Sequence, residues 1–324
     1  MLSDLIPATP LPAGALRLGQ PAAMVAASGP QAAERLFEFF TVHIRNAHTR
    51  RAYATAVRSF FAFCQRHGVG RLQDVSPILV AAYVESQPAS APTRKQHLAA
   101  IRMLYDWLVV GQVVAHNPAA AVRGPRHKVK VGKTPLLEAD QARTLLDSIP
   151  TNDLVGLRDR ALIATMLYTF GRVGAVVAMR VEDYYLAGRR WRFRLHEKNG
   201  NDLEMPAHHK AEEYVDAYLE AAGIRQQAGT PLFRSVDSRR ELTQHPLSQP
   251  DVFAMIRRRA RQAGLPGNVG CHTMRATGIT AYLRNGGRLE YAQKMAGHES
   301  ARTTGLYDRR SEELTRDEIE RIAI

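Results

Sequence analysis

Apolar side chains recur at helical spacing in the first third of the chain. In residues 49–63 they return at steps of three and four positions, which predicts an amphipathic helix. A second helix is predicted to begin near Ser90 or Thr93, because both are favourable N-cap residues ahead of an apolar stripe. We therefore expect the N-terminal part of the chain to be helical.

The rest of the chain shows the same helical spacing with one interruption. From Trp191 to Leu195 apolar residues alternate with arginines, and Asn199 and Gly200 follow as turn residues, which predicts a β-hairpin. The remaining helices are predicted at 137–149, 157–170, 212–222, 249–263, 273–285 and 288–295. Of these, 157–170 is apolar on most sides and is expected to be central. The fold class is therefore expected to be α+β, mainly α with a small β-hairpin or sheet.

Breaks in the apolar pattern suggest how the chain is divided. Residues 1–30 are rich in Ala and Pro and are expected to form a flexible arm. Residues 31–118 are expected to form a helical domain. Residues 119–134 contain no acid and are interpreted as an extended basic linker that does not pack into a core. Residues 135–324 are then a second domain, which ends in a short helix predicted to begin at Thr315.

Composition and charge narrow the function. With 324 residues, 45% of them apolar and 23% charged, the chain fits a folded protein of about two domains. No apolar run is long enough for a membrane helix, no secretory signal is seen, and two cysteines are too few for a disulfide framework. The expected location is the cytoplasm. The net charge of +13 favours a polyanionic partner, either nucleic acid or an acidic membrane surface.

The positive charge is concentrated in the predicted helical domain and linker. Residues 31–130 carry +9 of the total. A solvated helix face is the ordinary explanation for such charges, but two basic helices followed by a basic linker favour contact with a phosphate backbone. The candidate DNA-binding residues are Arg50, Arg51, Arg94, Lys95, Arg123, Arg126, Lys128 and Lys130.

Candidate chemistry lies in the second domain. No GxxxxGK[ST], GxGxxG, HExxH or CxxC motif is found, so nucleotide hydrolysis, dinucleotide cofactors and structural zinc have no support. His272 and Arg275 are three positions apart and would share a helix face. Arg172 directly follows the predicted central helix, and Tyr307 comes nine residues after His298. Each of these residues alone has an ordinary structural explanation.

Taken in order, six residues resemble the active-site set of the tyrosine recombinases, the integrase family of site-specific DNA recombinases. They are Arg172, Lys198, His272, Arg275, His298 and Tyr307. The most specific piece runs from Met295 through His298 to Tyr307, and the resemblance covers roughly residues 31–320. Lys198 is matched only by its position in the predicted hairpin. The resemblance implies a core-type DNA-binding domain at residues 31–118 followed by a catalytic domain at residues 135–324.

The resemblance also implies roles for these residues. Tyr307 would attack the scissile phosphate and form a 3′-phosphotyrosine, while His272 shares its proton. Arg172 and Arg275 would bind the non-bridging oxygens. Lys198 would protonate the leaving 5′ oxygen, and His298 would hydrogen-bond the phosphate. No metal and no cofactor is needed. Double-stranded DNA is the expected partner, bound by a homotetramer, and no membrane is involved.

Two positions depart from the family pattern. The family usually carries an acid three residues after the first arginine, where this chain has Ala175, and commonly a histidine after the second, where it has Ala276. Support for Arg172 must then come from elsewhere or be weaker. Two other functions stay open: a type IB topoisomerase-like DNA relaxation, and a DNA-binding protein of the same fold that has lost catalysis. Whether the tail after Tyr307 packs on its own chain or on a neighbouring protomer is also open.

Overall fold

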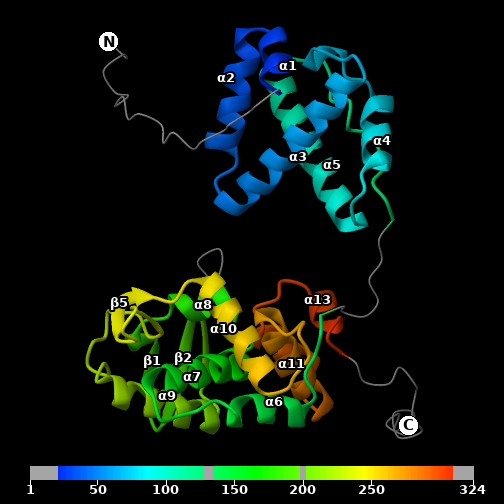
Figure 1. The fold of residues 1–324 in the computed structure, drawn as a ribbon. Coiled ribbons are helices and arrows are strands. Elements are labelled where there is room, and N and C mark those ends of the chain that lie inside the picture. Colours follow the sequence, from blue (N-terminus) through cyan, green and yellow to red (C-terminus); the bar gives the residue numbers. More distant parts are fainter. Residues whose placement is uncertain (1–20, 127–133, 198–201, 309–324) are drawn as a thin grey trace, which may run out of the picture. The chain divides into compact units, whose positions relative to one another are not determined.

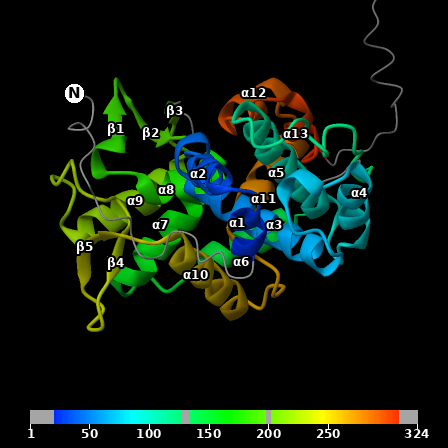
Figure 2. The same ribbon diagram turned by 90° about the horizontal axis from the view of Figure 1, so that it is seen from above.

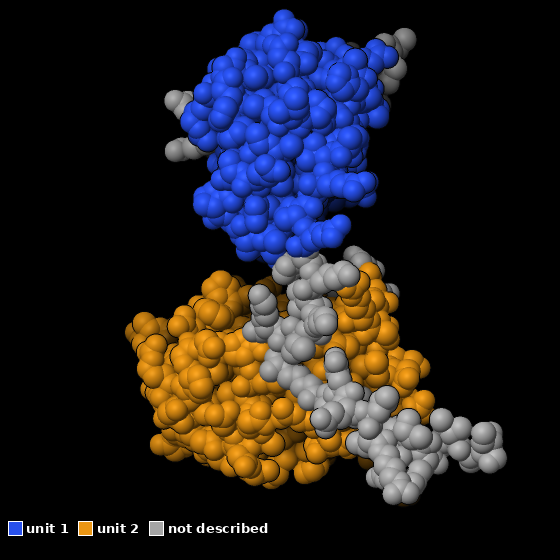
Figure 3. Space-filling model, turned by 90° about the vertical axis from the view of Figure 1, so that its right-hand side faces the viewer, with its two compact units in different colours: residues 1–128 blue, residues 129–324 orange. Residues whose placement is uncertain are grey.

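The structure is a computed structural model that describes residues 21–126, 134–197 and 202–308. The predicted tail helix and Lys198 lie outside these residues. The chain divides into two compact units, residues 1–128 and 129–324, which Figure 3 shows in different colours. This division falls inside the segment interpreted as a linker.

Unit 1 is a helical bundle (Figure 1). Asn46 begins the first long helix by accepting hydrogen bonds from the backbone N–H groups of His48 and Thr49. Ser90 begins the second by accepting from the N–H of Thr93, as its cap chemistry predicted. The helices are α1 (Pro21–Ala27), α2 (Pro30–Glu38), α3 (Ala47–Arg66), α4 (Pro77–Ser86) and α5 (Ala91–Val110), with a short π-helix η1 (Phe39–His43) and a short 3₁₀ helix η2 (Leu72–Asp74).

The prediction of a flexible arm is wrong for residues 21–30. They contain α1 and the start of α2, and Met24 and Val25 are buried in the core of unit 1. Ser28 joins this segment to the bundle by accepting a hydrogen bond of 2.8 Å from the N–H of Leu72. The Ala/Pro composition was misleading because proline is well tolerated in the first turn of a helix, where its missing N–H costs no hydrogen bond.

The linker interpretation is wrong for the first residues of 119–134. Ala119 and Val122 are buried in the same core. Arg102 of α5 donates hydrogen bonds to the carbonyl oxygens of both residues, at 3.0 Å for Ala119. The buried side chains of Ala119 and Val122, and the hydrogen bonds that their carbonyl oxygens accept from Arg102, hold the start of this segment against α5. The basic residues that follow do not alter these contacts.

The described part of unit 2 consists of helices and two small antiparallel sheets. The predicted hairpin is confirmed as β2 (Arg190–His196) and β3 (Asp202–Pro206), with Phe193 opposite Met205. Two further parts were not predicted: β1 (Tyr184–Ala187), which pairs with β2, and a separate sheet of β4 (Arg234–Val236) and β5 (Leu242–Pro246). The other elements are α6 (Ala139–Asp147), α7 (Leu154–Thr169), α8 (Val173–Ala178), η3 (Val181–Asp183), α9 (His209–Ala222), α10 (Gln249–Gln262), α11 (Cys271–Arg284), α12 (Leu289–Met295) and α13 (Ala301–Gly305).

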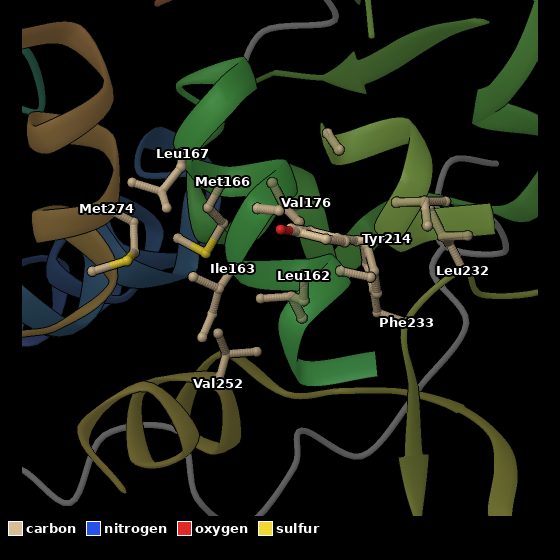
Figure 4. Packing of buried hydrophobic residues seen from close by; sticks show 14 of the residues in the cluster. Leu162, Ile163, Met166, Leu167, Val176, Tyr214, Leu232, Phe233, Val252 and Met274 are labelled. Carbon is tan, nitrogen blue, oxygen red and sulfur yellow. The ribbon is translucent and has the colours of Figure 1, made fainter. Parts of the chain in front are cut away.

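The core of unit 2 surrounds α7, as its apolar sequence predicted. Leu162, Ile163 and Met166 of this helix are fully buried. They face side chains from several other elements, including Val252 of α10 and Met274 of α11 (Figure 4). In the described part of the chain, no helix is both long and apolar enough to cross a membrane.

A glycine allows α11 to approach the end of α7 closely. A Cβ atom at Gly278 would lie 2.1 Å from the carbonyl oxygen of Leu167 and 2.8 Å from the ring of Phe170, so no other residue fits without movement. Helices α12 and α13 then follow at the end of unit 2 opposite to β4 and β5 (Figures 1 and 2). This approach brings residues of α11 beside the segment that follows α7.

Candidate active site

Five of the six predicted catalytic residues are described, and unit 2 brings them together. Arg172 precedes α8, His272 and Arg275 lie in the first turns of α11, His298 follows α12, and Tyr307 follows α13. The helix over 271–284 confirms that His272 and Arg275 share a face. Among residues 21–126, 134–197 and 202–308, no three His, Cys, Asp or Glu side chains lie close enough to hold a metal ion.

The Tyr307 hydroxyl meets a histidine that is suited to accept its proton. Its oxygen lies 3.0 Å from Nε2 of His272. Burial, with the nearby charges of Arg275 and Arg172, lowers the pKa of His272 below its usual value, so the imidazole is neutral at pH 7. Thr280 fixes the backbone of Tyr307 by donating to its carbonyl oxygen at 3.1 Å. The tyrosine is therefore held beside a neutral base.

His298 is also held neutral and in a fixed orientation. Burial, with the charges of Arg275 and Arg172, lowers its pKa to about 4. Its Nδ1 lies 2.9 Å from Oγ1 of Thr304, and its ring stacks on that of Tyr307 at 5.8 Å. Because Nδ1 is engaged with Thr304, Nε2 is the ring nitrogen that remains to hydrogen-bond a ligand.

Arg275 connects two chain segments at the centre of the site. Its guanidinium donates to the carbonyl oxygens of Phe170 and Ala296. Phe170 presents its carbonyl from a left-handed backbone (φ 53°), a conformation that costs a non-glycine residue about 1 kcal/mol. Burial and the like charge of Arg172 lower the pKa of Arg275 to about 10, so it stays protonated at neutral pH.

Arg172 forms an ion pair that the sequence did not reveal. Its Nη1 contacts Oε2 of Glu197, and its Nη2 donates to the carbonyl oxygen of Gly297 at 3.3 Å. Ala175, where an acid was expected, is 5% exposed and supplies no charge. Two signals could have pointed to Glu197: the missing acid at Ala175, and an acid directly before Lys198.

The predicted DNA-binding residues lie in unit 1 and the segment that follows it. Arg50 is turned to its own unit, since Nε and Nη2 donate to the carbonyl oxygen of Ile44 at 3.1 and 2.9 Å. Arg94 is half-buried, whereas Lys128 and Lys130 lie outside the described residues. The exposed ones are Arg51, Lys95, Arg123 and Arg126.

The lowered pKa of His272 predicts the pH dependence of any reaction in which this imidazole accepts the Tyr307 proton. The imidazole of His272 must be neutral to accept a proton. Because its pKa is lowered, it becomes protonated only at lower pH than an ordinary histidine. We expect kcat/KM, which reports the free protein, to fall only below about pH 6.5, the usual histidine value. The native chain is compared with His272→Asn and, as control, with a variant at the exposed histidine, His245→Asn. An acid limb centred at or above pH 6.5 in the native chain would contradict this assignment.

Comparison with known proteins gives matches over both units. Residues 135–313 match the phage integrase family, and residues 39–111 match the phage integrase N-terminal SAM-like domain. The tyrosine recombinase XerC of Pelobacter propionicus is 28% identical over 264 residues, covering 80% of this chain and 84% of that protein.

Solved structures give likenesses of fold. The XerH site-specific recombinase bound to its difH substrate, in a pre-cleavage complex, matches with a TM-score of 0.63 at 17% identity, covering 91% of this chain and 83% of that one. A lambda integrase tetramer bound to a Holliday junction matches with a TM-score of 0.62 at 18% identity, covering 89% and 83%.

Proposed function

The chain belongs to the phage integrase family, and from this premise we propose that it is a tyrosine-type site-specific DNA recombinase. It cleaves and rejoins duplex DNA through a covalent 3′-phosphotyrosine intermediate. The observation that carries this proposal is the Tyr307 hydroxyl 3.0 Å from the neutral imidazole of His272, with Arg172 and Arg275 beside it.

The proposed reaction exchanges one phosphate ester for another. The oxygen of Tyr307 attacks phosphorus, the bond between phosphorus and the 5′ oxygen breaks, and the tyrosine becomes linked to the 3′ phosphate. His272 accepts the tyrosine proton, and Lys198 is proposed to protonate the leaving 5′ oxygen. Rejoining reverses these steps with the 5′ hydroxyl of the partner strand, so the phosphate bond energy is retained.

The arginines are proposed to stabilise the charge that develops on the phosphate. Guanidinium groups are planar, carry several donors and stay protonated, which suits the non-bridging oxygens of the transition state. Arg275 is already oriented by the carbonyls of Phe170 and Ala296. His298, held neutral, is proposed to donate a further hydrogen bond to the same phosphate.

The partner is proposed to be a specific duplex site, bound by a homotetramer. The crystallised lambda integrase is a tetramer on a Holliday junction, and this likeness supports the same assembly here. A DNA substrate also supports a location in the cytoplasm. Unit 1 and the basic segment after it are proposed to hold the phosphate backbone through Arg51, Arg94, Lys95, Arg123, Arg126, Lys128 and Lys130, with Arg50 in a supporting structural position.

The test uses DNA flanking the gene that contains an imperfect inverted repeat. The full chain is incubated with a nicked copy of this site, from which the short cleaved strand diffuses away, and the covalent adduct is detected on a denaturing gel. Recombination between two intact copies on one plasmid is measured in parallel. No adduct on any candidate site would overturn the proposal in favour of a DNA-binding protein without catalysis. Relaxation of plasmids that lack the site would instead indicate a topoisomerase.

Contacts to phosphates predict a specific salt dependence. Replacing Lys128 and Lys130 by Gln should weaken DNA binding and reduce the slope of log K against log salt by about 1.8, because each phosphate contact contributes about 0.9. Sequence preference should not change, since phosphate contacts do not read bases. The control is Lys210→Gln, whose ammonium pairs with Glu213 in unit 2. An unchanged slope in the double variant would exclude these lysines from the contact.

A further inference from the structure

The carboxylate of Glu197 is placed to control the first arginine of the site. It follows the last residue of β2, and its Oε2 pairs with Nη1 of Arg172. The side chain of Glu197 is only 7% exposed, whereas that of Arg172 is 39% exposed. The carboxylate is therefore shielded from water and the guanidinium still has an accessible side.

Among the described residues, the Glu197 carboxylate pairs with Arg172 alone. Its second oxygen, Oε1, is buried and has no hydrogen-bond partner there. On the other side of the pair lies Gly297, where a Cβ atom would be 3.7 Å from Nη1 of Arg172 and 3.8 Å from Cγ of Glu197. The pair is thus confined between the end of β2 and the turn after α12.

Electrostatics explain why Arg172 needs an acid. The charges of Arg172 and Arg275 are close enough that Arg172 lowers the pKa of Arg275, while Glu197 acts in the opposite direction. Without a bound anion between them, these two nearby guanidiniums repel each other. A buried carboxylate behind one of them offsets this repulsion and restricts a long side chain that would otherwise sample many rotamers.

From these contacts we propose that Glu197 is a positioning residue, which orients Arg172 for the scissile phosphate in place of the acid that is absent at Ala175. The inference rests on the proposed recombinase function. The ion pair also fixes the end of β2 from which the chain continues directly to Lys198. The same ion pair therefore holds both Arg172 and Glu197, and Glu197 directly precedes the proposed general acid, Lys198.

The first measurement is the rate of adduct formation on the nicked site under single-turnover conditions. We expect Glu197→Gln to lower this rate by about 10- to 100-fold, the loss typical of a misplaced catalytic group. The Kd for DNA should stay within about threefold, because the variant removes a negative charge and no phosphate contact. Glu197→Asp, which keeps the charge, should recover part of the rate. The matched control is Glu204→Gln, which breaks an exposed pair with Arg194 in the same sheet.

A double-mutant cycle separates positioning from a general structural effect. If Glu197 acts through Arg172, then adding Glu197→Gln to Arg172→Ala should change the slow residual rate by less than about twofold. Equal losses in both backgrounds would overturn the proposal. So would a faster rate in Glu197→Gln alone, since Glu197 would then compete with phosphate for Arg172. A native rate in Glu197→Gln, with adduct still formed by the native chain, defeats this inference and leaves the proposed function intact.

Discussion

Replacing Tyr307 by Phe is expected to abolish the covalent adduct with DNA. The variant keeps the ring that stacks on His298 and packs in the cluster with Phe170, and it removes only the oxygen that lies 3.0 Å from His272. Without a nucleophile no phosphate ester forms, so the rate should fall on the order of 10⁴-fold or more. DNA affinity and folding should be close to native, because the ring and its contacts remain.

The control for this prediction is Tyr291→Phe. Tyr291 lies on α12 close in sequence to His298, and its side chain is exposed. This variant should form the adduct at the native rate. Peptide mapping of the native adduct identifies the linked residue directly. An adduct that persists in Tyr307→Phe, or a link that maps to another tyrosine, would refute the assignment of the nucleophile.

Replacing Arg275 by Lys is expected to reduce cleavage by about 10²- to 10³-fold, the cost of losing one preorganised donor to transition-state charge. Lysine keeps the charge but presents a single ammonium, which cannot reach the carbonyls of both Phe170 and Ala296 while also serving a phosphate. The loss should appear in the single-turnover rate more than in the Kd for DNA.

The same variant should also destabilise unit 2 by about 1–3 kcal/mol, because a buried carbonyl oxygen loses its partner. Urea unfolding measures this effect. The control is Arg284→Lys. Arg284 lies on the same helix, α11, and its guanidinium pairs with Glu138, which precedes α6. Equal cleavage rates for Arg275→Lys and the native chain would show that the several N–H donors of the Arg275 guanidinium are not required.

Local sequence was sufficient where neighbours along the chain decide the structure. The caps at Asn46 and Ser90 start their helices through bonds to residues two or three positions away. The three-residue spacing of His272 and Arg275 places both on one face of α11. The apolar sequence of α7 indicated a central helix, and the alternating residues after Arg190 indicated β2 and β3.

Local sequence failed where distant segments meet. The core contacts of Met24 depend on how unit 1 closes, so the extent of the arm was misjudged. Strand β1 was missed for a local reason: its four residues are all apolar or aromatic and show no alternating pattern. Lys198 lies outside the described residues, so its role as general acid stays a prediction from the sequence.

The sequence by itself determined the residue types of the candidate site, their order along the chain and the helix that carries His272 and Arg275. These depend on side-chain identity and on spacings of three or four positions, which the backbone geometry of a helix converts into shared faces. Only the tertiary structure decided which carboxylate stands behind Arg172. Glu197 is 25 positions away, and it reaches the arginine because β2, which ends just before Glu197, packs against α8, which begins just after Arg172. Contacts of that range depend on packing, which no local pattern encodes.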